Sequence, residues 1–186
     1  MRCKAKKPAR PRPMDLKSRI RTVMDFPKPG IGFKDITTLL LDAKALAEAV
    51  KRMAGPFTKA GITKIVGIES RGFIFGMPMA FYMNVPFVPI RKPGKLPAAT
   101  EEESYQLEYG TDKIQIHRDA IAAGDKVLLV DDLLATGGTM SAAVNLVRKL
   151  KGEVAGAVFL IELDFLQGRG KLKDVRVHSL VHYDGE

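Results

Sequence analysis

The 186-residue sequence contains a single cysteine, Cys3, and no tryptophan. One cysteine excludes an internal disulfide framework and a zinc site built from cysteines. No uninterrupted apolar stretch approaches the roughly 18–20 residues that a membrane-spanning helix needs. The N-terminal segment also lacks the apolar core of a secretory signal. We therefore expect a cytoplasmic protein with no membrane partner.

Acidic residues are absent from the first 13 positions, and this absence explains much of the net charge of +9. Residues 1–13 contain six lysines and arginines, so they supply +6 and the remaining chain only +3. Three prolines and few apolar residues in this segment favour a disordered basic tail. A nucleic-acid-binding arm is the alternative, but no aromatic residue lies between the charges, and we expect no nucleic-acid partner.

Beyond the tail, short apolar runs alternate with segments of helical periodicity. Asp15 and Asp42 are suited to cap the first two helices. Strands that alternate with helices indicate an α/β fold in which both faces of a parallel sheet are covered. Residues 91–113 interrupt this rhythm and are predicted to form an exposed loop or hairpin. The predicted helices are 16–24, 43–60, 73–83 and 139–150, and the predicted strands are 64–68, 85–90, 126–130, 154–161 and 175–183.

The stretch VLLVDDLLATGGTM at 127–140 combines an apolar strand, two carboxylates and a small-residue turn that opens a helix. Asp131 and Asp132 follow the predicted strand, where hydroxyl groups or a metal can reach them. The turn offers backbone N–H groups and hydroxyls to an anion at a helix N-terminus, so the whole stretch favours a sugar phosphate. No lysine follows the glycines as in a P-loop, and the dinucleotide-binding spacing is absent. The alternative is an ordinary turn in which the glycines only permit tight bending.

A second polar turn, residues 69–72, follows an earlier predicted strand. Because the carboxyl ends of parallel strands meet at one edge, this turn and the acid pair are expected to share a crevice. Ser70 and Arg71 are suited to pyrophosphate, since a guanidinium fork matches two oxygens. An ordinary turn with an exposed arginine is the alternative. Three cations lie farther along the chain, at Arg91, Lys92 and Lys95. They are suited to attract an anionic substrate, and a solvated basic turn is the alternative.

Four ordered segments resemble the type I phosphoribosyltransferases, and in particular the adenine-specific branch of that family. VLLVDDLLATGGTM resembles the family's phosphoribosyl-diphosphate signature. The resemblance implies a central, mostly parallel sheet flanked by helices in one domain, 14–186, with a small N-terminal hood at about 14–40 and a mobile lid at about 94–113. The other segments are DFPKPGIGFKDIT at 25–37, similar to the purine-binding segment, GIESRGFIFG at 67–76, similar to the pyrophosphate loop, and VPIRKPGKLP at 88–97 with SYQLEYG at 104–110, similar to the catalytic lid.

The resemblance also implies a reaction, in which the 5-phosphoribosyl group passes from phosphoribosyl diphosphate to adenine, giving AMP and pyrophosphate. Magnesium is expected to arrive on the substrate, with no ligand supplied directly by the protein. A homodimer is implied, in which Arg91 reaches across to the neighbouring site. Two alternatives stay open: a phosphoribosyltransferase for another purine base, and a regulator that only senses phosphoribosyl diphosphate.

The implied site roles are divided among the four segments. Glu108 is the candidate for handling the proton on nitrogen 7 of adenine. The family often has a cis peptide at the position of the bond between Glu69 and Ser70. The ribose hydroxyls are assigned to Asp131 and Asp132, the 5-phosphate to Ala135, Thr136, Gly137, Gly138 and Thr139, the pyrophosphate to Ser70, Arg71, Arg91, Lys92 and Lys95, and adenine to Gly32, Phe33 and Lys34.

Several residues depart from the family pattern or have no expected role. Lys34 stands where the family usually has arginine, and Gly32 where a bulkier residue is common. If the backbone makes the contacts to adenine, specificity should tolerate both departures. The affinity for the base and the rigidity of the loop are more sensitive to them. Residues 101–103 are expected to form a solvated acidic face on the lid. His178 and His182 share a strand face, but the sequence shows no suitably spaced acidic or cysteine partner for a metal site.

Overall fold

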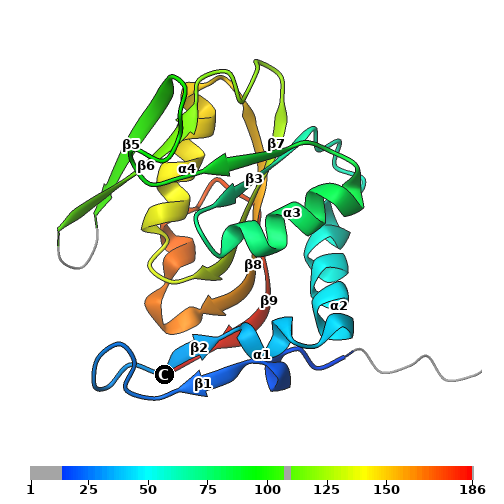
Figure 1. The fold of residues 1–186 in the computed structure, drawn as a ribbon, viewed down its shortest axis with the longest axis vertical. Coiled ribbons are helices and arrows are strands. Elements are labelled where there is room, and N and C mark those ends of the chain that lie inside the picture. The colour runs from blue at the N-terminus through cyan, green and yellow to red at the C-terminus, as the bar shows by residue number, and fades with distance from the viewer. Residues whose placement is uncertain (1–13, 107–109, 186) are drawn as a thin grey trace, which may run out of the picture.

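The computed structural model describes residues 14–106 and 110–185, so the expected basic tail and residues 107–109 lie outside the described part. A five-stranded parallel sheet of order β4-β3-β7-β8-β9 forms the centre (Figure 1). Its strands are rich in valine, isoleucine and leucine because both faces of the sheet are covered. The predicted α/β class is confirmed. The strands are β3 (Lys64–Ile68), β4 (Phe87–Ile90), β7 (Lys126–Leu134), β8 (Glu153–Leu163) and β9 (Val177–Tyr183).

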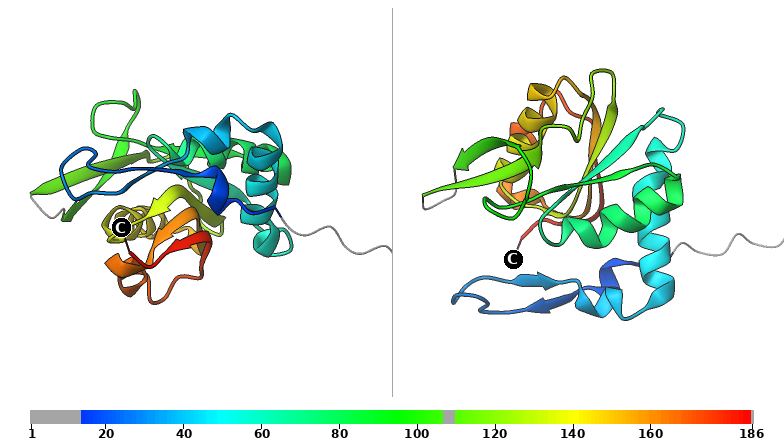
Figure 2. Two further views of the ribbon diagram at one scale, coloured as in Figure 1. Left: turned by 90° about the horizontal axis from the view of Figure 1, so that it is seen from below. Right: turned by 45° about the horizontal axis from the view of Figure 1, so that its top comes forward.

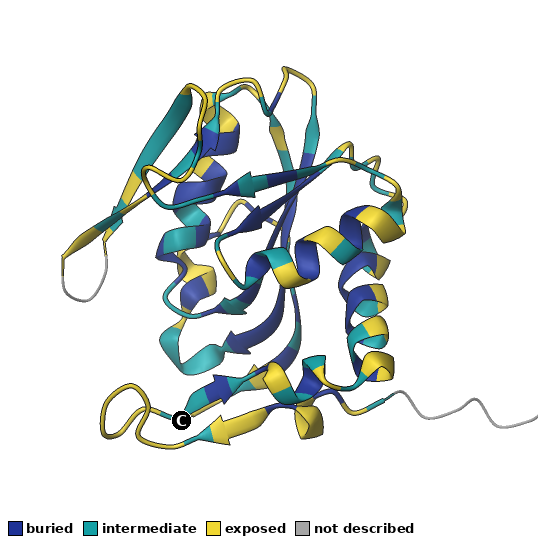
Figure 3. Cartoon of the chain, in the orientation of Figure 1, coloured by how far each residue is buried: buried dark blue, intermediate teal, exposed yellow. Residues whose placement is uncertain are grey.

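Helices α2 (Ala43–Ala54) and α3 (Gly72–Met83) cover one face of the sheet, and α4 (Gly138–Lys149) covers the other. Figure 3 shows the buried residues along the strands and on the helix sides that face them. The side chain of Asp42 caps α2 as predicted, because it accepts hydrogen bonds from the backbone N–H groups of Lys44 and Ala45. No helix in the described ranges is long and apolar enough to cross a membrane.

The second helix ends earlier than predicted. Instead of running to residue 60, α2 ends at Ala54 and is followed by the 3-10 turn η2 (Gly55–Phe57). Pro56 explains the change, because proline has no N–H to donate and its ring is accommodated only near the start of a helical turn. Phe57 is then buried in the core.

The helix predicted at 16–24 is wrong. Asp15 caps only the short 3-10 turn η1 (Lys17–Arg19), after which the chain enters β1 (Arg21–Val23). This strand pairs antiparallel with β2 (Phe33–Asp35), and the short helix α1 (Thr37–Leu40) follows. Pairing with a segment ten or more residues away overrides the local preference for helix. Figures 1 and 2 show the resulting hairpin beside the carboxyl end of the sheet, in the region expected to be a hood.

The segment that was expected to be a loop or hairpin contains an antiparallel hairpin, β5 (Thr100–Gln106) with β6 (Thr111–His117). It lies beside α4 in Figure 1. The expectation that residues 101–103 form a solvated acidic face is wrong, because all three are partly buried. Their carboxylates form ion pairs with Arg118, Lys113 and Lys149. Only the Glu103 pair joins the hairpin to α4, through Lys149; the other two pairs lie within the hairpin and the turn that follows it.

Candidate functional site

A cleft of about 390 Å³ opens at the carboxyl edge of the sheet, where the two polar turns meet as predicted. Strands β3 and β7 are neighbours in the sheet, so the segments that follow them are adjacent although about 60 residues separate them in sequence. The hairpin β5–β6 contributes Tyr105 and Ile114 to the wall. The polar lining residues are Glu69, Ser70, Arg71, Lys92, Tyr105, Asp131, Asp132, Thr136 and Thr139, together with the glycines at 137 and 138.

The acid pair lies inside a strand rather than after it. Strand β7 was predicted to end at residue 130, but it continues to Leu134 because Asp131 and Leu133 pair with Phe159 and Ile161 of β8. Asp131 is partly exposed in the cleft and Asp132 is buried. The Oδ1 atom of Asp131 accepts a hydrogen bond of 2.9 Å from the backbone N–H of Asp132. Strand geometry therefore holds both carboxyl groups firmly at the cleft.

The two carboxyl groups influence one another. Burial, followed by the charge of Asp132, raises the pKa of Asp131 well above its ordinary value. Burial also raises the pKa of Asp132, and the neighbouring Arg71 guanidinium acts in the opposite direction. A pair that resists double ionisation is suited to accept hydrogen bonds or positive charge from a ligand.

Arg71 connects the second turn with the acid pair and the N-terminal hairpin. Its Nε atom lies 2.9 Å from Asp132 Oδ2, an ion pair in which the N–H is not aimed at the oxygen. Among the residues that the structure describes, Asp132 Oδ2 consequently has no hydrogen-bond partner. The Arg71 guanidinium also lies 5.4 Å from the centre of the Phe33 ring. Arg71 therefore contacts both the buried acid of the pair and the N-terminal hairpin.

The start of α4 provides the predicted anion cradle. Residues 135–137 form a turn, and Gly137, with a φ of 76°, precedes the first helical residue. No side chain caps this helix, so its first N–H groups are available to an anion. A Cβ atom on Gly137 would lie 2.4 Å from the carbonyl oxygen of Gly168. The close approach of two glycine backbones gives the cradle its shape.

The turn at 69–72 is held against the acid pair by another close approach. A Cβ atom on Gly72 would lie 2.7 Å from the Val130 carbonyl oxygen and 3.1 Å from Asp131 Oδ1. The peptide bond between Glu69 and Ser70 is cis, as the family resemblance implied. Ser70 and Arg71 both line the cleft. The structure therefore brings together the two turns that the sequence separates.

The three predicted cations are divided between two acidic partners. Lys92 lines the cleft, and its Nζ atom contacts the Asp112 carboxylate and lies 3.3 Å from the Tyr105 hydroxyl oxygen. Arg91 and Lys95 instead pair with Glu69. Sequence reasoning missed Glu69, Asp112 and Tyr105 as site residues, because only the fold places these side chains beside the basic segment.

Although burial acts to raise it, the hydrogen bonds that Glu69 accepts lower the pKa of this carboxyl group to about 2. The donors are Lys95, the backbone N–H of Lys92 and Arg91, in decreasing order of effect. Glu69 is therefore ionised at neutral pH.

The predicted base-binding residues lie in the N-terminal hairpin and not among the residues that line the cleft. Phe33 packs edge-on against Phe26 and reaches the cleft through its contact with Arg71. The Lys34 side chain is buried, with Nζ 4.5 Å from the centre of the Tyr183 ring. Lys34 therefore ties β2 to the end of β9 through its side chain, and its backbone lies opposite Thr22 in the β1–β2 pair. Glu108 lies outside the described residues.

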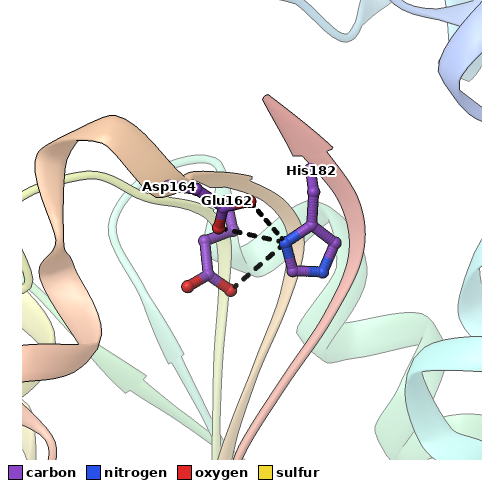
Figure 4. Close-up of side chains that lie close together, drawn as sticks. All are labelled: Glu162, Asp164 and His182. Atoms are coloured by element: carbon purple, nitrogen blue, oxygen red, sulfur yellow. Dashed lines mark hydrogen bonds and ion pairs between the residues drawn. The ribbon is translucent and has the colours of Figure 1, made fainter. Parts of the chain in front are cut away.

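The expectation that His182 has no acidic partner is wrong. Its Nδ1 atom lies 3.1 Å from Asp164 and 3.9 Å from Glu162 (Figure 4). Glu162 pairs with His182 in the register of β8 and β9, a relationship that sequence spacing does not reveal. Arg169 already donates two hydrogen bonds, of 2.6 and 2.7 Å, to the buried Glu162 carboxylate. These contacts form an ion-pair network that anchors the turn containing Gly168 beside the anion cradle.

Comparisons with known proteins show the family of the chain. The sequence matches the family model described as the phosphoribosyl transferase domain over residues 37–181. The adenine phosphoribosyltransferase of Acidobacterium capsulatum is 56% identical over 168 residues, which are 90% of this chain and 93% of the relative. The crystal structure of adenine phosphoribosyltransferase from Thermoanaerobacter pseudethanolicus has a TM-score of 0.88 at 49% identity, and the match covers 90% of this chain and 98% of that one. The enzyme from Saccharomyces cerevisiae, complexed with an imino-altritol bisphosphate and adenine, has a TM-score of 0.84 at 39% identity, with 89% and 96% covered.

Proposed function

Because the chain belongs to the phosphoribosyltransferase family, and within it to the adenine phosphoribosyltransferases, we propose that the cleft binds phosphoribosyl diphosphate in two halves. The reaction transfers the 5-phosphoribosyl group to adenine and gives AMP and pyrophosphate. One observation carries the site assignment: the acid pair of β7, the cradle at the start of α4 and the turn at 69–72 line a single cleft.

The ribose half is formed by β7 and the start of α4. Asp131 and Asp132, which both line the cleft, accept hydrogen bonds from the ribose hydroxyls. The 5-phosphate lies against the backbone of residues 135–139, with the Thr136 and Thr139 hydroxyls as further donors. As the bond to pyrophosphate breaks, positive charge develops on the sugar ring, and the neighbouring carboxylates stabilise it.

The pyrophosphate half is formed by the turn at 69–72 and the basic segment. Ser70 and Arg71 hold the leaving group from one side, and Lys92 faces it from the other side of the cleft. Arg91 and Lys95 pair with Glu69 beside the cleft, and the family resemblance assigns Arg91 to the neighbouring site of the proposed homodimer. The donors in the cleft bind the leaving group more strongly as its negative charge grows, so they favour the transition state over the bound substrate.

Adenine is placed between the hood and the cleft. The Phe33 ring and the backbone of Gly32 and Lys34 contact the base, and Arg71 links this segment to the ribose half. Backbone carbonyls that accept from the exocyclic amine favour adenine over a 6-oxo purine. Adenine then attacks the anomeric carbon with inversion. We assign the proton on nitrogen 7 to Glu108 on the family resemblance, and an unchanged rate for Glu108→Ala would remove that assignment.

The hairpin β5–β6 is the proposed lid. A Cβ atom on Gly138 would lie 3.2 Å from the Gln106 carbonyl oxygen and 3.5 Å from a Tyr105 ring carbon, so the hairpin covers the cradle. Exclusion of water protects an electrophilic sugar from hydrolysis. The family resemblance adds movement of this hairpin during the reaction cycle.

Magnesium is proposed to arrive on the diphosphate and to offset its charge there. Carboxylate and phosphate oxygens are the ligands it prefers, and it keeps several waters. Asp131 and Asp132 are hard oxygen donors in the cleft, but Arg71 and the Asp132 backbone engage them. The residues present therefore fit an ion held mainly by phosphate oxygens and water.

A cytoplasmic location stays a prediction.

A homodimer is proposed from the exposed apolar face of α3. Phe81 is 91% exposed and Met77 55%, and Ile74 and Tyr82 extend the same surface. Positions 74, 77 and 81 recur at helical spacing and therefore lie on one side of the helix. An apolar patch of this kind marks an interaction surface, and a second copy of the chain is the occupant that the family resemblance implies.

The site assignment is tested by measuring AMP formation with Asp131→Asn and Asp132→Asn, singly and together. We expect kcat/KM for phosphoribosyl diphosphate to fall on the order of 100-fold or more, because amides keep the shape but lose the charge. Asp119→Asn, which changes an exposed aspartate in a turn, is the matched control. Full activity in the double variant would overturn the assignment. Assays with hypoxanthine, guanine and xanthine test the base, and faster turnover of one of these than of adenine would contradict the specificity.

A further inference from the structure

Glu69 accepts hydrogen bonds from all three cationic residues of the basic segment at 91–95: Arg91, Lys92 and Lys95. Its Oε2 atom accepts from Arg91 Nε at 3.2 Å and from the backbone N–H of Lys92 at 3.0 Å. Its Oε1 atom accepts from Lys95 Nζ at 2.8 Å and from the second Arg91 nitrogen, Nη2, at 3.4 Å. One carboxylate therefore holds two cationic side chains and the main chain between them.

Lys92 extends this arrangement to the opposite wall of the cleft. Its main chain is bound to Glu69, whereas its ammonium group contacts Asp112 and Tyr105 of the hairpin. Glu69 and Lys92 both line the cleft. The position of the Lys92 ammonium group thus depends on a backbone that Glu69 holds.

The charges explain why a carboxylate is needed at this place. Arg91, Lys92 and Lys95 lie within five residues and repel one another unless an anion lies between them. The Glu69 side chain is only 12% exposed, so water screens these interactions poorly there. Without this anion the Arg91 and Lys95 side chains would lose the acceptor that they share.

We propose that Glu69 is a positioning residue for the binding of pyrophosphate: it holds the Arg91 and Lys95 side chains and the Lys92 main chain in place before a diphosphate binds, whether in this cleft or in the neighbouring site that Arg91 is implied to reach. The inference rests on the proposed assignment of the pyrophosphate half. Glu69 acts through the cations and not by touching the reacting atoms. Prior placement lowers the ordering cost that binding would otherwise carry.

The test compares Glu69→Gln with wild type in both directions of the reaction. We expect KM for phosphoribosyl diphosphate and for pyrophosphate to rise about 10-fold, while KM for adenine and for AMP stays within about twofold. A generally disturbed fold would raise all four values together, so this split separates positioning from structure. Glu69→Asp keeps the charge on a shorter side chain, and it should raise the same two KM values by a smaller factor.

Asp125→Asn is the matched control, because Asp125 also pairs with a lysine, Lys64, at 2.8 Å and accepts a hydrogen bond from Thr63 at 2.9 Å, but lies outside the lining of the cleft and outside the proposed lid. It should leave all four KM values unchanged. Thermal melting checks that each variant is folded. If Glu69→Gln does not fold, Glu69→Asp decides the matter, and an unchanged KM for pyrophosphate in that variant overturns the proposal.

A folded Glu69→Gln variant with unchanged KM for both diphosphates would overturn the proposal. A lower KM would overturn it as well, since it would mean that Glu69 competes with the substrate for the cations. Lys92→Met separates this result from failure of the proposed function. A raised KM for pyrophosphate in Lys92→Met with no change in Glu69→Gln refutes only the positioning role, whereas no change in either refutes the assignment of this half to pyrophosphate.

Discussion

Arg71 Nε lies 2.9 Å from Asp132 Oδ2, and this ion pair joins the turn after β3 to the acid pair within β7. The same guanidinium lies over the Phe33 ring of the hood. Three segments that are assigned to pyrophosphate, ribose and adenine therefore meet at one side chain. Loss of the Arg71 side chain is therefore expected to affect all three.

Replacement of Arg71 by glutamine should weaken binding and change the pH dependence of the reaction. The Arg71 charge opposes the effect of burial on Asp132, so its loss raises the pKa of that carboxyl group further. Because ionised Asp132 is the required acceptor, the acidic limb of the kcat/KM profile should move to higher pH. We also expect kcat/KM to fall about 10- to 100-fold at neutral pH.

Steady-state assays between pH 5 and 9, with each profile scaled to its own maximum, check this prediction. Arg118→Gln removes an arginine that pairs with Glu101 on the hairpin and should leave the profile in place. An acidic limb of Arg71→Gln that coincides with wild type would show that Arg71 does not tune Asp132.

Gly168 should tolerate no side chain. A Cβ atom there would lie 2.2 Å from the Ala135 carbonyl oxygen, so Gly168→Ala must displace the anion cradle. We expect KM for phosphoribosyl diphosphate and AMP to rise about 10-fold or more, with a smaller effect on KM for pyrophosphate. Gly170→Ala is the matched control, since nothing lies within 4 Å of its added atom. Equal KM values for the two variants would contradict the argument.

The α3 surface should control the association of two chains. Phe81→Glu places a charge at a side chain that is 91% exposed, so it should not disturb folding but should oppose burial in an interface. Sedimentation velocity is expected to show a dimer for wild type and mainly monomer for the variant. Leu41→Glu, at a position that is 87% exposed outside α3, serves as the control and should remain dimeric. Monomeric wild type would refute the proposed dimer.

Asp35 should make the stability of the hood hairpin depend on pH. Hydrogen bonds from the Thr37 backbone and from Arg21 lower the pKa of Asp35 from 3.8 to about 2. Because the pKa of Asp35 is lower in the folded protein than in the unfolded chain, the ionised carboxylate stabilises the folded protein above about pH 4. This stabilisation is lost as pH falls toward 2. Asp35→Asn should cost about 1 kcal/mol at pH 7, a value that allows for solvent screening at the exposed Arg21.

Urea unfolding at several pH values checks this expectation, because the difference between wild type and Asp35→Asn should shrink between about pH 4 and pH 2. Asp184→Asn removes a similar charge from an exposed position near the C-terminus and is expected to change stability by less than about 0.5 kcal/mol. A difference that stays constant down to pH 2 would argue against a role for the ionised carboxylate.

Elements with a strong local signal were predictable from the sequence. Strand β3 and the Asp42 cap of α2 were predicted correctly. Strand β3 is a short apolar run, and the Asp42 side chain accepts hydrogen bonds from N–H groups only two and three residues away. The segment at 16–24 was not, because β1 exists only through its pairing with β2. The length of β7 was also missed, since Asp131 stays in the strand through its pairing with β8.

The sequence by itself determined the α/β class, the family, the acid pair and the two loops of the cleft, because each depends on residues that are close along the chain. Only the tertiary structure decided the partners of the charges: Glu69 with Arg91 and Lys95, Arg71 with Asp132, and Glu162 with Arg169. It also decided that Gly168 presses on the cradle. The physical reason is that ion pairing and close packing depend on distance in space, which the order of strands in the sheet determines and the local sequence does not.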